Sequence, residues 1–104
     1  MDNETLIMQI VAFSGEANSR VYDALEAYSE HGLEASMKLL DEAEEMIVMA
    51  SRNQFQLLNQ EANGNEITMT VLLTHAMDIC TIASNQIQYT KNLLTMFDKR
   101  KKVE

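Results

Sequence analysis

Apolar residues recur every three or four positions along most of this chain, which is the repeat of one face of an α-helix. The spacing predicts a first helix from about residue 3 to residue 30. Its apolar face comprises Leu6, Ile10, Phe13, Ala17, Val21, Ala24 and Tyr28. A second helix is predicted from about residue 33 to residue 62, with a stripe that Gln54 interrupts near its end. That stripe comprises Leu40, Ala43, Ile47, Ala50 and Leu57.

Two breaks separate the periodic stretches, at His31-Gly32 and at Asn63-Gly64-Asn65. Glycine and asparagine tolerate the left-handed backbone found just past helix ends. A third helix is therefore predicted from residue 65, with Asn65 as N-cap, to about residue 102, a rod on the order of 50 Å long. Short connections make consecutive helices antiparallel neighbours, so we expect an all-α, up-down-up three-helix bundle.

Composition supports a helical fold, because the 104 residues include no proline and only three glycines. A chain of this length suits one domain, covering residues 1–104. The eight methionines are interpreted as core filling rather than as an adaptable binding groove. A domain this small buries only part of its apolar surface, which makes oligomerisation a reasonable expectation.

The charge balance narrows the range of partners. Sixteen acidic residues against eight basic ones give a formal charge of −8, which disfavours nucleic acid as a ligand. The basic run from Lys99 to Lys102 is expected to close the last helix and complement its dipole, in preference to acting as a lipid or nucleic-acid tail. Cys80 is the only cysteine, and we see neither a signal peptide nor an apolar run long enough for insertion into a membrane. We therefore expect a cytoplasmic protein.

The third predicted helix carries two stripes. The first is a continuous apolar seam of Leu72, Ala76, Ile79, Ala83, Ile87, Leu94 and Phe97. The second mixes apolar and polar residues, and comprises Val71, His75, Asp78, Ile82, Asn85, Tyr89, Leu93 and Met96. A second seam implies a second partner.

If the partner of the second stripe is the same helix of another copy, the Asp78 carboxylates approach one another at a symmetry axis. They would then need a shared proton, a divalent cation or residual water, and carboxylate oxygens suit Mg²⁺. The spacing fits equally well a monomer in which Asp78 is simply solvated.

His75 is the main candidate for chemistry, because imidazole can act as a base, a metal ligand or a phosphoryl acceptor. Spacing alone favours a merely structural histidine, and His31 is interpreted as part of a solvated helix end. The chain has no Gly-rich phosphate loop, no Ser/His/Asp grouping and no Cys/His metal spacing. A complete active site within one chain is therefore not expected.

Four stretches, residues 10–20, 22–25, 50–55 and 72–78, resemble the IIA components of the lactose and cellobiose branch of the bacterial phosphoenolpyruvate-dependent sugar phosphotransferase system. The most specific match is Leu-Leu-Thr-His-Ala-Met-Asp at 72–78. The family pattern there reads approximately Val-His-Ala/Gly-Gln-Asp-His-Leu-Met-Thr. His75 falls on the family's phosphorylated histidine, and Asp78 falls on the aspartate that gathers around a metal ion.

The resemblance implies a homotrimer in which one Asp78 from each subunit faces a structural Mg²⁺ at the axis. It also implies a phosphoryl carrier: His75 accepts the group from the phosphohistidine of HPr and passes it to a cysteine of a IIB component during uptake of a lactose- or cellobiose-type sugar. Two departures are Met77 and Ile79, which replace the family's usual glutamine and second histidine and would affect transfer rate or metal affinity. They leave open a degenerate member that regulates a partner, and a purely structural adaptor is the remaining alternative.

Overall fold

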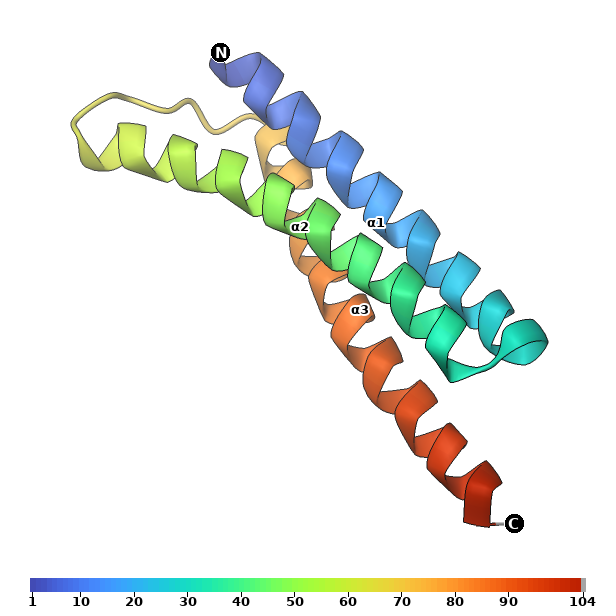
Figure 1. Ribbon diagram of the computed structural model, residues 1–104. Helices are drawn as coiled ribbons and strands as arrows, with labels where there is room; N and C mark the ends of the chain where they lie inside the picture. The colour runs from blue at the N-terminus through green and yellow to red at the C-terminus, as the bar shows by residue number, and fades with distance from the viewer. Residues whose placement is uncertain (104) are drawn as a thin grey trace.

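The computed structural model describes residues 1–103 and contains the helices α1 (Asn3–His31), α2 (Leu33–Ala62) and α3 (Val71–Val103). Figure 1 shows α1 and α3 running in the same direction, with α2 antiparallel to both. The predicted all-α, up-down-up bundle is thus confirmed for the described residues, whereas residue 104, the end of the predicted domain, lies outside them. The molecule is elongated, measuring 58 × 19 × 19 Å.

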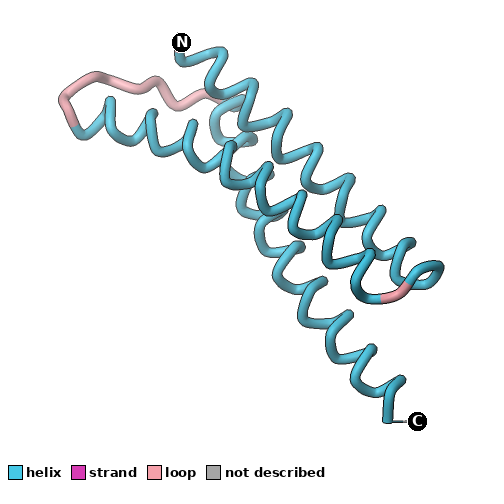
Figure 2. The backbone as a smooth tube through the Cα atoms, viewed as in Figure 1, coloured by secondary structure: helices cyan, strands magenta, loops and turns pink. Residues whose placement is uncertain are grey.

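Short polar contacts define both ends of α1. At its start, the Asp2 carboxylate accepts a hydrogen bond of 2.8 Å from the Thr5 amide. This bond lowers the pKa of Asp2 because it favours the ionised form. At its end, Gly32 has a φ of +90° and its amide donates to the Tyr28 carbonyl. The predicted break at His31-Gly32 is confirmed, and α2 begins at the next residue (Figure 2).

Small residues hold α1 and α2 close together. Ala17 and Ala24 of α1 and Ala43 and Ala50 of α2 have no exposed surface, which lets the two backbones approach. The buried Ser36 hydroxyl reaches across and donates to the Ala24 carbonyl. This hydrogen bond between the two helices fixes the position of α2 along α1.

The predicted stripes of α1 and α2 largely form the core. All five residues of the α2 stripe are buried, and in the α1 stripe only Phe13 and Tyr28 remain half-buried. Between Ala50 and Leu57 of this stripe, α2 also buries a polar residue, Asn53. Its buried amide donates to the Gln9 side chain at 2.9 Å and to the Leu6 carbonyl at 3.3 Å. The polar group is therefore satisfied and adds specificity to the α1–α2 contact.

The predicted start of α3 at residue 65 is wrong, because α3 begins at Val71. Asn65 instead lies just past the end of α2, after the turn at Gly64, whose φ is +90°, and its amide donates to the Gln60 carbonyl of α2 at 2.9 Å. An irregular segment then crosses to α3 (Figure 2). The residue that caps α3 is Thr70, whose hydroxyl accepts a hydrogen bond of 3.0 Å from the Leu73 amide.

The buried face of α3 is also rotated relative to the predicted seam. Leu72 and Phe97 are exposed and Ile79 is half-buried. The buried residues of α3 are Leu73, Ala76, Cys80, Ala83, Ile87, Thr90 and Leu94. Three consecutive apolar residues, Val71, Leu72 and Leu73, begin α3, so the periodicity there does not select one face.

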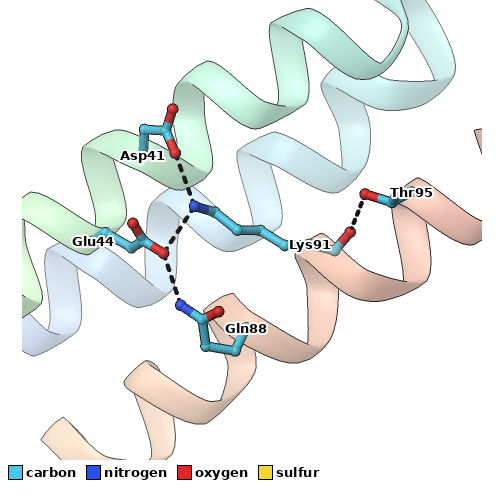
Figure 3. A network of polar contacts seen from close by, with 5 residues as sticks. All are labelled: Asp41, Glu44, Gln88, Lys91 and Thr95. Carbon is cyan, nitrogen blue, oxygen red and sulfur yellow. Dashed lines mark hydrogen bonds and ion pairs between the residues drawn. The ribbon is translucent and has the colours of Figure 1, made fainter.

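A polar network fastens α3 to α2 (Figure 3). The Lys91 ammonium of α3 lies 2.8 Å from both the Asp41 and the Glu44 carboxylates of α2. Gln88 donates to the same Glu44 oxygen at 2.7 Å. Burial lowers the pKa of Lys91, but the hydrogen bonds to Asp41 and Glu44 outweigh burial and raise it above its usual value.

None of the helices in residues 1–103 contains a stretch long and apolar enough to cross a lipid bilayer.

Candidate functional site

His75 lies near the start of α3 with its side chain exposed. Asp78, one turn further along, is exposed on the same face. The two side chains line one shallow surface depression. The other residues that line it are Met69, Thr70, Val71 and Thr74. The structure therefore brings the two candidate residues together, and both are accessible from outside the chain.

The depression opens onto the second predicted stripe of α3, which the rest of the chain leaves uncovered. Four of its apolar residues have large exposed fractions, which are 89% for Val71, 55% for Ile82, 67% for Tyr89 and 64% for Met96. Only Leu93 in this stripe is half-buried. A row of exposed apolar side chains on one helix is typical of a surface that another protein covers.

The residues around His75 determine the chemistry available there. A neutral imidazole nitrogen is a nucleophile, and the Thr70 and Thr74 hydroxyls beside it are hydrogen-bond donors for an anionic ligand. No cationic side chain lines the depression, whereas Asp78 contributes a carboxylate. Phosphate oxygens would be repelled by that carboxylate unless a proton, a cation or a partner protein neutralised it.

Sequence reasoning missed Thr70 and Thr74 as neighbours of His75. The available signal was the preference for threonine at helix N-caps. That preference competed with Asn65 and Glu66, which form an equally good start signal five residues earlier in the chain. A helix that starts at residue 65 would contain Thr70 in its interior and not at its cap.

The two residues that depart from the family pattern that the sequence resembles do not line the depression. Met77 is half-buried and packs against the hydrophobic core. Ile79 is also half-buried. Since Met77 points away from the surface that His75 shares with Asp78, its presence removes no polar group from that surface within one chain.

A metal ion is not accounted for by one chain alone. Within residues 1–103 there is no group of three or more His, Cys, Asp or Glu side chains with the arrangement of a metal site. Asp78 supplies a single carboxylate, so a cation there would need ligands from further copies. His31 is far from this chemistry in the sequence and is exposed, with its ring 3.7 Å from the Glu30 carboxylate, as expected for a solvated helix end.

An exposed histidine next to an uncovered apolar face is typical of a surface that other proteins contact. Similarity to known proteins identifies the family of this chain. Residues 5–98 match the family model described as "PTS system, Lactose/Cellobiose specific IIA subunit". The chain therefore belongs to the lactose/cellobiose-specific IIA family of the sugar phosphotransferase system, whose members are phosphotransferase components.

Individual relatives agree with this assignment. The lactose-specific EIIA component of Lacticaseibacillus casei is 30% identical over 95 residues, which are 91% of this chain and 85% of that protein. The lactose-specific EIIA component of Staphylococcus epidermidis is 30% identical over 96 residues, covering 92% of each chain. The crystal structure of the cellobiose-specific enzyme IIA from Bacillus anthracis superimposes with a TM-score of 0.89 at 25% identity, covering 97% of this chain and 93% of that one.

Proposed function

We propose that this protein is a phosphoryl carrier in which His75 accepts a phosphoryl group from the phosphohistidine of HPr and passes it to a cysteine of a IIB component. In the first step an imidazole nitrogen of His75 attacks the phosphorus atom in line. A new N–P bond forms as the N–P bond to the donor histidine breaks. In the second step the cysteine thiolate attacks the phosphorus atom, an S–P bond forms as the N–P bond to His75 breaks, and His75 leaves as neutral imidazole.

The observation that carries this proposal is the exposure of His75 within a depression lined by hydroxyl groups. Phosphoryl transfer depends mainly on positioning and on stabilising charge at the equatorial oxygens. The Thr70 hydroxyl accepts from the Leu73 amide and still has its own proton to donate. The Thr74 hydroxyl lies beside His75 in the same depression, so two donors are available to phosphoryl oxygens.

Function is proposed to require three copies of the chain. The uncovered stripe of α3 supplies the interface, and Asp78 would place one carboxylate from each copy at a common axis. Carboxylate oxygens suit Mg²⁺, which would neutralise these charges and hold the copies together. Neutralisation of Asp78 would in turn remove the repulsion that a phosphoryl group on His75 would otherwise meet. We propose that this carrier works in the cytoplasm.

The carrier proposal is tested by incubating the protein with phosphoenolpyruvate, enzyme I and HPr. An acid-labile phosphoryl adduct should form on the wild type and be lost in His75→Ala, while the matched control His31→Ala should retain it. Adding a cognate IIB should discharge the adduct. A wild-type chain that forms no adduct would contradict the carrier function and favour the regulatory or structural alternatives.

The trimer is tested at Asp78. Sedimentation velocity should give three copies for the wild type, with a mass that decreases when EDTA removes divalent cations. Asp78→Leu replaces the clustered carboxylates with apolar packing, so it should keep or strengthen the assembly while abolishing metal binding by calorimetry. A monomeric Asp78→Leu protein would show that Asp78 does not lie at the axis.

A further inference from the structure

The basic residues of this chain are concentrated at one end of α3. The run Lys99, Arg100, Lys101 and Lys102 holds four of the eight Lys and Arg residues, and all four side chains are exposed. Residues 1–98 contain the other four together with fifteen acidic residues, a formal charge of −11. The molecule therefore has a strongly acidic body and a basic tip, defined here as Lys99–Lys102.

The fold separates the basic tip from the acidic body. Figure 1 shows the last turns of α3 extending past the α1–α2 connection and away from it. Between Val71 and Lys102, the last buried side chain of α3 is Leu94, and Met96 and Phe97 beyond it are 64% and 56% exposed. Lys102 pairs with Asp98 at 3.2 Å within the same helix. The last turns of α3, which carry the tip, therefore project from the bundle (Figure 1).

We propose that the basic tip binds the surface of an anionic lipid membrane. Clusters of Lys and Arg on a helix are attracted to acidic lipid headgroups when they lie within about one Debye length, roughly 8 Å, of the surface. Approach along the α3 axis brings the tip to the membrane first and keeps the acidic body behind the tip, where salt screens its repulsion. The exposed Phe97 and Met96 add apolar groups beside the cations.

A lipid surface fits this tip better than a folded acidic protein does. A specific protein complex needs about 800 Å² from each partner together with shape complementarity. The end of a single helix offers neither, whereas a bilayer surface is broad, uniformly charged and without a required shape. The same residues also complement the negative end of the α3 dipole, and this role does not compete with binding to headgroups.

The inference rests on the proposed function in one respect. If three copies associate with their α3 helices parallel, three basic tips lie at the same end of the assembly and bind one bilayer together, which increases avidity. This arrangement would hold a carrier of phosphoryl groups near the membrane component that takes up the sugar. His75 lies near the opposite end of α3, so the tip can be changed without touching the acceptor.

The test is co-sedimentation of the full-length protein with vesicles. Vesicles of 70% phosphatidylcholine and 30% phosphatidylglycerol should bind the wild type at 50 mM NaCl, and 0.5 M NaCl should release it. Vesicles of phosphatidylcholine alone should not bind. The double variant Lys99→Gln/Lys101→Gln should bind the anionic vesicles about 10- to 30-fold more weakly.

The matched control is Lys38→Gln/Arg52→Gln, which removes the same charge from α2 and should bind like the wild type. Equal binding by both double variants, or no binding of the wild type, would overturn the proposal, and the second result would direct attention to an acidic protein partner. Phosphorylation of His75 should be the same in both variants and the wild type. Failure of the vesicle test with normal phosphorylation would therefore leave the carrier function intact.

Discussion

The two faces of α3 have similar apolar spacing but different surroundings. On one face the side chains of Ala76, Ala83 and Ile87 are buried between α1 and α2, with exposed fractions of 1% or less. On the other face Ile82 and Tyr89 are more than half exposed, and His75 and Asp78 lie among them. One face stabilises the fold of a single chain. The other is an apolar surface whose contribution depends on what covers it.

Apolar periodicity thus marks a helix face that is suited to contact with another element. It does not tell whether that element belongs to the same chain. A burial pattern at spacings of three and four residues is the same whether the covering helix belongs to the same chain or to another one. The distinction must come from the polar residues in each stripe. The buried face contains Thr90 as its polar member, whereas the exposed face contains an imidazole and a carboxylate, which are groups with chemistry to offer a partner.

The largest expected effect is at the buried face. Ile87→Ala removes a side chain that is 1% exposed, so it loses both transfer free energy and packing contacts. We expect the free energy of unfolding to decrease by about 2–5 kcal/mol. Urea denaturation followed by circular dichroism measures this change. A loss below about 1 kcal/mol would show that the buried face is not the tightly packed side of α3.

The ion pairs between α3 and α2 should contribute less to the free energy of unfolding. Lys91→Met keeps much of the apolar stem but removes the ammonium that contacts Asp41 and Glu44. These carboxylates are 66% and 39% exposed, so solvent screens the pairs and we expect a loss of about 1 kcal/mol. The control is Lys38→Met, an exposed lysine of α2, which should change the free energy of unfolding by less than about 0.5 kcal/mol.

The same network predicts a dependence on alkaline pH. Because the pKa of Lys91 is raised in the folded chain, its stabilisation is complete below the unfolded pKa of about 10.5 and is lost as pH rises through the folded value. The free energy of unfolding of the wild type should therefore decrease over the interval in which pH rises from about 10.5 through the raised folded pKa of Lys91. The difference between wild type and Lys91→Met should narrow over that interval. A constant difference would contradict the assigned ion pairs.

The smallest effect on unfolding is expected at the exposed face. Ile82→Ala is the matched partner of Ile87→Ala, with the same substitution in the same helix at a side chain that is 55% exposed. At protein concentrations where the chain is dissociated, the free energy of unfolding should change by less than about 0.5 kcal/mol. Sedimentation velocity should nevertheless show weaker self-association. A large loss of stability in the dissociated chain would mean that this face is covered from within.

Much of the fold follows from local signals in the sequence. The end of α1 and the start of α2 are fixed by Gly32, since a positive φ is readily adopted there by glycine alone. The core of α2 is likewise predictable, because polar residues surround a single apolar stripe. The start of α3 was misplaced because Asn65 satisfies two roles equally well from sequence, and only its bond to the Gln60 carbonyl shows that it completes α2.

The candidate site was predictable in part. His75 and Asp78 share a face because they lie three residues apart on a helix, and the structure confirms that both line one depression. The contribution of Thr70 was not predictable, because it depends on where the connection from α2 ends. Two positions along a helix place Met77 on a different side from His75. The sequence does not show that this side faces the core, because the predicted seam is rotated relative to the buried face of α3.

The N-cap at Thr70 bears on how quickly a partner protein could bind the first turn of α3 in a reactive arrangement. Its hydroxyl and its carbonyl accept from the Leu73 and Thr74 amides, each at 3.0 Å, so the turn that carries the acceptor is held at its free end. Helix ends otherwise fray rapidly, and a frayed turn would have to reorder whenever a partner arrived. For the proposed carrier, a histidine whose backbone is already ordered would lose little conformational entropy in the complex, which favours transfer during a short-lived encounter.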